Sequence, residues 1–85
     1  MGRVAAAASV GLPEKSAAVA ARYRLTPRET ELLVLLAHGR NGPFIQEKLV
    51  LSRNTVKTHV ANIYGKLGVH SQQELIDLVE EAGDR

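Results

Sequence analysis

Signals that begin and end helices divide residues 25–83 into short segments, and this division constrains the fold more than any other feature of the sequence. The clearest signal is the segment TPRE at 26–29. Its threonine can cap a helix, its proline suits the first turn, and its glutamate can accept a hydrogen bond from the cap amide. Leucines follow at helical spacing until Gly39, and glycine favours the left-handed conformation at helix ends. We predict a core helix between these signals.

Three further helices are predicted by the same reasoning. Asn41 can cap a short helix that ends near Val50, and Ser52 can cap a third helix over about 53–67. The segment SQQE at 71–74 is a second capping box, which opens a fourth helix that ends before Gly83. No segment alternates apolar and polar residues as a strand would. The sequence therefore predicts an all-α domain of four helices over 25–82, with a C-terminal tail at 83–85.

Residues 1–24 are rich in alanine, are interrupted by glycine and proline, and lack a sustained apolar stripe. Such a segment cannot bury enough apolar surface to form a core of its own. We interpret it either as a linker or tail that is helical in part, over about 14–22, or as a disordered segment.

Charge is unevenly distributed along the chain. Residues 25–70 contain six basic and three acidic side chains, whereas residues 71–85 contain one basic and five acidic side chains. A basic middle beside an acidic end indicates an anionic partner for the middle. The absence of cysteine excludes disulfides, thiolate zinc sites and cysteine nucleophiles. No apolar run approaches the roughly 20 residues that cross a bilayer.

The third predicted helix has two different faces. Its apolar residues recur on one side at the spacing of a packed stripe: Val56, Val60, Ile63 and Leu67. Its opposite side gathers small, polar and basic residues: Asn54, Lys57, Thr58, Ala61 and Gly65. Amide, ammonium and hydroxyl groups are the types that read base edges in the major groove, and the helix has no carboxylate to repel phosphate. A short helix, a tight turn and a helix of this kind form a helix-turn-helix.

Two long stretches, LTPRETELLVLLAHG at 25–39 and NTVKTHVANIYGKLGVHS at 54–71, closely resemble the LuxR-type (GerE-type) helix-turn-helix DNA-binding domain. The resemblance extends from about residue 25 to residue 79. It implies the effector domain of a bacterial transcriptional regulator, which binds double-stranded DNA as a homodimer and needs neither a cofactor nor a small-molecule substrate. It also implies an upstream sensor domain that is not in this chain. We expect this domain to work in the cytoplasm, whether the rest of the protein is cytoplasmic or anchored in a membrane.

The resemblance further implies roles for single residues. The positions that face base edges are Asn54, Lys57, Thr58 and Ala61. The positions that meet the DNA backbone are Arg53, Thr55, His59, Lys66 and Ser71. The fourth helix pairs two subunits in such regulators, and here it offers Leu75, Ile76 and Val79.

The chain departs from the family pattern in the turn and at several positions near the DNA backbone. Val50 stands where the family favours glycine, and a β-branched residue resists positive φ, so we expect a strained or remodelled turn. Other departures replace a small alanine or polar and basic residues: Gln46, the pair Gly42-Pro43, Gly65 and Gln72. We expect weaker backbone binding by the isolated domain, compensated by dimerisation.

Metal binding and catalysis have little support in the sequence. The histidines His38, His59 and His70 lack the i, i+4 spacing of a helical zinc pair. The caps account for Glu29 and Glu74, which leaves no evident pair of groups for acid–base chemistry. A protein-interaction module is the alternative function, because a helix-turn-helix fold does not by itself determine function.

Overall fold

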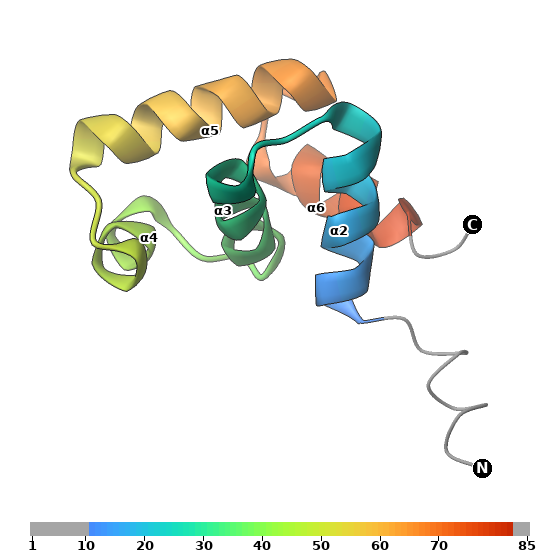
Figure 1. The fold of residues 1–85 in the computed structure, drawn as a ribbon, viewed down its shortest axis with the longest axis horizontal. Coiled ribbons are helices and arrows are strands. Elements are labelled where there is room, and N and C mark those ends of the chain that lie inside the picture. The colour runs from blue at the N-terminus through green and yellow to red at the C-terminus, as the bar shows by residue number, and fades with distance from the viewer. Residues whose placement is uncertain (1–10, 83–85) are drawn as a thin grey trace, which may run out of the picture.

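The computed structural model describes residues 11–82, which form five helices and no strand (Figure 1). The all-α class is confirmed. The four predicted helices are present, and a fifth precedes them. The first ten residues of the expected linker and the expected tail at 83–85 lie outside the described residues. The helices are α2 (Leu12–Tyr23), α3 (Pro27–Ala37), α4 (Gly42–Leu49), α5 (Arg53–Leu67) and α6 (Gln72–Ala82).

Helix α3 lies at the centre of the fold and contacts α2, α5 and α6, while α4 packs mainly against α5 (Figure 1). The core is a single cluster of buried apolar residues drawn from every helix: Val19, Leu32, Leu33, Leu36, Ala37, Ile45, Val56, Ile63, Leu67, Val69, Leu75 and Val79. This cluster fixes the orientation of α5 relative to the rest of the domain. None of the described helices is long and apolar enough to span a membrane.

Helix α2 is longer and better packed than the sequence suggested. It begins two residues before and ends one residue after the predicted range of 14–22, and it contacts both α3 and α6. Its buried residues are Ser16, Val19 and Ala20, and Tyr23 packs against the core. Serine and alanine carry little apolar surface, so the buried side of α2 could not be recognised as an apolar stripe in the sequence. The segment is thus part of the folded unit rather than only a connection to it.

The predicted helix starts are confirmed by their hydrogen bonds. At α3, Thr26 Oγ1 accepts from the Glu29 amide at 3.1 Å and Glu29 Oε1 accepts from the Thr26 amide at 2.9 Å. At α4, Asn41 Oδ1 accepts from the amide of Phe44 at 2.9 Å. Each bond spans three residues, so local sequence is sufficient to place it.

The second capping box is only half formed. Ser71 Oγ accepts from the Glu74 amide at 3.2 Å, as predicted, but Glu74 Oε1 accepts from the amide of His70 at 2.8 Å, one residue before the cap. The carboxylate therefore ties the loop before α6 to its first turn.

Val50 adopts the left-handed conformation, with φ 55° and ψ 54°, and its amide donates to the carbonyl of Gln46. The turn between α4 and α5 thus keeps a left-handed residue at the position where the resemblance led us to expect glycine. Valine is strained in that conformation at a cost of about 1–2 kcal/mol. The side chain is 88% exposed. Because it packs against so little, the backbone can take this conformation without disturbing the core.

Candidate nucleic-acid interface

Helix α5 is anchored along the side that the sequence predicted. Val56, Ile63 and Leu67 are buried in the core, and Val60 is half-buried against it. Ser52 caps the helix by accepting from the Thr55 amide at 3.1 Å, and Gly68 ends it with φ 72°. Since both ends and one whole side are held, the opposite side is presented to solvent in a single orientation.

The four residues predicted to face base edges share this exposed side: Asn54, Lys57, Thr58 and Ala61. Gly65 continues it toward the end of the helix and is also exposed. The helix contains no carboxylate, so the exposed side combines an amide, an ammonium and a hydroxyl group with small residues. This arrangement can donate to and accept from base edges while leaving room for close approach.

The residues predicted to meet the DNA backbone are less uniform. Arg53 is exposed in the first turn of α5, where the helix dipole also favours an anion. Thr55 and His59 are half-buried, and the Thr55 hydroxyl accepts from Ser52 Oγ at 2.8 Å. Ser71 is exposed, and its Oγ accepts the amide at the start of α6, which leaves its own hydroxyl proton free to donate.

Lys66 pairs with a buried carboxylate of the domain, while its own side chain stays 38% exposed. Its Nζ donates to Glu29 Oε1 at 2.7 Å, and this ion pair joins the end of α5 to the start of α3. The Glu29 side chain is only 6% exposed. Burial by itself would raise the pKa of Glu29, but hydrogen bonds from Lys66 and Thr26 and the charge of the ammonium outweigh it, so the pKa lies below its ordinary value of 4.5. Lys66 therefore stabilises the fold, and its charge is largely compensated before DNA arrives.

A groove of about 500 Å³ borders the exposed side of α5. Its walls come from the end of α3, the start of α4, the middle of α5 and the start of α6. Two of its lining residues, Lys57 and Ala61, belong to the predicted base-facing set. The lining includes no carboxylate: Leu36, Arg40, Asn41, Gly42, Ile45, Val56, Lys57, Val60, Ala61, Tyr64 and Gln72. Burial raises the pKa of Tyr64, which keeps its hydroxyl protonated and able to donate.

Gln72 is a residue whose role the sequence did not reveal. Its Nε2 donates to the carbonyls of Leu36 at 3.0 Å and Arg40 at 2.9 Å. It thereby holds the connection between α3 and α4 against the start of α6, which shapes one wall of the groove. The sequence showed only that Gln72 replaces a frequent arginine, because its partners lie more than thirty residues away.

The predicted dimer residues on α6 require a correction. Leu75 and Val79 have no exposed surface and belong to the core of the subunit, where α3 and α2 cover them. They cannot contact a second subunit while the domain is folded. Ile76 is half-buried and is the only one of the three with surface available. Apolar spacing on a helix does not by itself distinguish the core from an interface.

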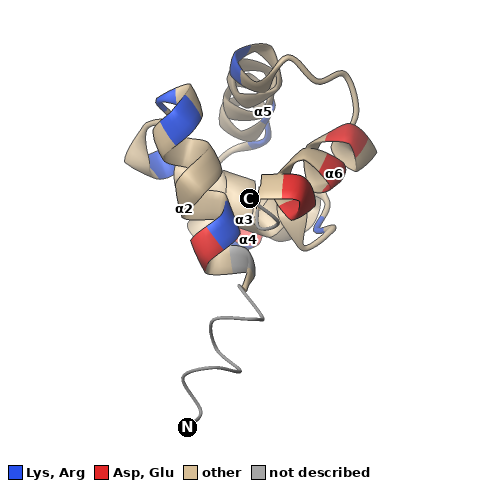
Figure 2. Cartoon of the chain, turned by 90° about the vertical axis from the view of Figure 1, so that its right-hand side faces the viewer, with Lys and Arg blue, Asp and Glu red and all other residues tan. Residues whose placement is uncertain are grey.

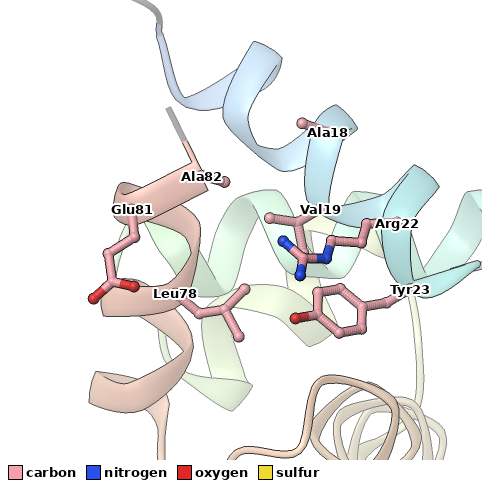
Figure 3. Close-up of a pocket in the computed structure, with 7 residues that line it drawn as sticks. All are labelled: Ala18, Val19, Arg22, Tyr23, Leu78, Glu81 and Ala82. Atoms are coloured by element: carbon pink, nitrogen blue, oxygen red, sulfur yellow. The ribbon is translucent and has the colours of Figure 1, made fainter. Parts of the chain in front are cut away.

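A second groove, of about 360 Å³, lies between α2 and α6 (Figure 3). Figure 3 shows Arg22 and Tyr23 extending from α2 toward Leu78 of α6. Its walls also include Glu81, so a cation and a carboxylate share this groove. The mixed charge makes it a poor surface for DNA. No cluster of three or more potential metal ligands occurs within residues 11–82.

Comparison with known proteins identifies the domain. The family described as bacterial regulatory proteins, luxR family, matches residues 23–79. The chain is 51% identical over 53 residues to the Fimbriae Z protein of Escherichia coli, a match that covers 62% of this chain and 25% of that protein. It is 48% identical over 62 residues to the uncharacterized response regulatory protein YgeK of the same organism, covering 68% of this chain and 42% of that protein.

A third relative is the probable transcriptional regulatory protein SgaR of Hyphomicrobium methylovorum, which is 46% identical over 54 residues, covering 64% of this chain and 26% of that protein. The chain thus spans about a quarter to two fifths of the length of these relatives. No solved structure matches it. The matched residues include all of α3, α4 and α5 and most of α6. The chain belongs to the luxR family of bacterial regulatory proteins and contains the family's DNA-binding helix-turn-helix.

Proposed function

We propose that this domain reads specific duplex DNA by inserting α5 into the major groove, as the effector domain of a larger transcriptional regulator. The observation that carries this proposal is the pairing of a packed side and an open side on α5. Base-reading groups occupy the open side, no carboxylate accompanies them, and the core fixes their orientation. Asn54, Lys57 and Thr58 would supply hydrogen bonds to base edges, while Ala61 would contact a thymine methyl group.

Backbone contacts in this proposal come from the first half of α5 and from the start of α6. Arg53 offers a positive charge beside free helix amides, and Ser71 offers a hydroxyl proton. Thr55 and His59 are half-buried, so they would contact a phosphate only where the DNA backbone comes close to α5. Lys66 adds little, since its ammonium is already paired with Glu29.

A homodimer on a two-fold related site is the second part of the proposal, and an upstream sensor domain is the third. Subunit contact would use the outer side of α6, which includes Ile76. Acidic residues surround that side, so self-association should strengthen as salt screens their repulsion, whereas DNA binding should weaken. The response regulatory name of one relative supports a sensor or receiver domain upstream.

The test is a selection of duplexes from a randomised pool, followed by fluorescence anisotropy with the selected and a scrambled duplex across a salt series. We expect the wild-type chain to prefer the selected duplex, with two chains bound per duplex. Lys57→Ala should reduce that preference by about 5- to 150-fold, which corresponds to about 1–3 kcal/mol for a base contact.

Arg22→Ala is the matched control, because it removes an exposed cation from α2, outside the groove beside α5. It should leave the preference for the selected duplex unchanged. If the folded wild-type chain binds no duplex even at low salt, sequence-specific DNA binding is refuted, and the protein-interaction module becomes the better explanation of the fold.

A further inference from the structure

Arg40, in the connection between α3 and α4, is exposed, yet both its backbone and its side chain are held by contacts within the domain. Its amide donates to the carbonyl of Leu35 at 3.0 Å, and its carbonyl accepts from Gln72 Nε2 at 2.9 Å. Its guanidinium carbon lies 4.5 Å from the centroid of the Phe44 ring. Backbone and side chain are therefore both positioned before any ligand binds.

Packing of the core does not explain why a phenylalanine stands at position 44. Its side chain stays 38% exposed in the first turn of α4, and it does not belong to the buried core. A guanidinium stacked on an aromatic ring uses its flat face for that contact. The N–H groups at its edge remain free, and these are the donors that match a phosphate in two-pronged geometry.

Arg40 also lies beside the surface that would read DNA. It lines the same groove as Lys57 and Ala61 on α5, and Arg40 and Lys57 are the only charged residues in that lining. Among the described residues no carboxylate forms an ion pair with Arg40, in contrast to Lys66, which is paired with the buried Glu29. A strand of DNA backbone lying over this groove would meet an uncompensated cation at its edge.

We propose that Arg40, stacked on Phe44, binds a phosphate of the DNA backbone at the edge of the groove beside α5. This inference rests on the proposed function and deepens it. It also supplies a cation at the point where Gly42 and Pro43 offer none, because Arg40 directly precedes the cap of α4. Arg40 carries no sequence information in this role and would set affinity and register.

The test measures the salt dependence of binding to both the selected and the scrambled duplex. Arg40→Ala and Arg40→Gln should weaken both complexes by the same factor, and each should flatten the slope of log affinity against log salt by about 0.9 per bound chain. Phe44→Leu keeps the charge, so it should weaken binding by a smaller factor with a smaller change in slope. Thermal melting of each variant should stay close to wild type, since both side chains are exposed.

Arg22→Ala is again the matched control, because Arg22 also lies over an aromatic ring, that of Tyr23 at 5.6 Å, but outside this groove. Its slope should equal that of wild type. If Arg40→Ala leaves the slope unchanged while Lys57→Ala still reduces preference for the selected duplex, the role of Arg40 is refuted and the proposed function stands. If the wild-type chain binds no duplex, both are refuted.

Discussion

Helices α5 and α6 pack against the same core in the same way, but they present opposite charges to solvent (Figure 2). Each buries apolar residues along one side. The exposed residues of α5 include Arg53 and Lys57 and no acid. Those of α6 include four acids: Glu74, Asp77, Glu80 and Glu81. Packing pattern alone therefore does not identify the helix that meets DNA, whereas the charge of the free side does, because phosphate is attracted to one and repelled by the other.

Helices α5 and α6 should respond alike when the core that they share is disturbed. Ile63→Asp on α5 and Leu75→Asp on α6 each place a carboxylate at a position with no exposed surface. Burying an unpaired charge costs several kcal/mol, which is comparable to the whole stability of a small domain, so both variants should be unfolded. Far-ultraviolet circular dichroism would measure this as loss of helix. Asn62→Asp is the control, since Asn62 is exposed on α5 and should tolerate the change. A folded Ile63→Asp domain would contradict the assignment of the packed side.

The two helices should respond differently when a carboxylate is added to the exposed side of each. Thr58→Glu places a carboxylate on the open side of α5, and Gln73→Glu places one on the exposed surface of α6. Like charges brought together at an interface cost several kcal/mol, so Thr58→Glu should weaken binding to the selected duplex by at least about tenfold. Gln73→Glu should change it by less than about twofold. Equal losses in an anisotropy titration would show that the two helices do not differ in their distance from DNA.

The ion pairs that anchor the two helices should contribute unequally to the stability of the domain. The pair Lys66–Glu29 ties α5 to α3 and buries its carboxylate, while Lys15–Glu80, at 3.1 Å, ties α2 to α6 with its carboxylate 55% exposed. Glu29→Gln should cost about 1–2 kcal/mol near neutral pH, because it weakens hydrogen bonds to a charged group. Glu80→Gln should cost less than about 1 kcal/mol, as exposed pairs do.

The cost of Glu29→Gln should also depend on pH, and the direction follows from the lowered pKa of Glu29. The native state prefers the ionised carboxyl more than the unfolded chain does. Its contribution is therefore complete above the unfolded value of 4.5 and is lost as pH falls through the lower folded value. Denaturant unfolding at a series of pH values should show the difference between wild type and Glu29→Gln shrinking on acidification. A difference that grew on acidification would refute the sign of this shift.

The helices that the sequence predicted best are those whose signals are local. The caps at Thr26, Asn41 and Ser52 each involve a bond across three residues, so no knowledge of the fold was needed to place them. The two sides of α5 were also predicted, because a helix converts the spacing of Val56 and Ile63 directly into a common face. The roles of the base-facing residues stay predictions until DNA binding is measured.

The failures share the opposite property. Leu75 and Val79 have the spacing of an interface and of a core alike, and only the position of α2 and α3 showed that they belong to the core. The stripe on α2 was missed because its small residues bury little area each and matter only when another helix approaches closely. The ion pair of Lys66 with Glu29, thirty-seven residues earlier, was also not visible in the sequence, and the role of Lys66 at the DNA backbone stays a prediction.

Local sequence was therefore enough to predict helices α3 to α6, the packed and open sides of α5, and the charges that separate α5 from α6. These properties act within a few residues of the chain, where backbone geometry fixes which groups meet. Which cations are paired and which apolar residues are covered depends on how the helices pack. The carbonyl of Arg40 accepts from Gln72, and Arg40 lines one groove with Lys57, whereas Lys66 is compensated by a buried carboxylate. Such partners are far apart along the chain and meet only when the helices pack. Signals that act within a few residues therefore cannot predict them.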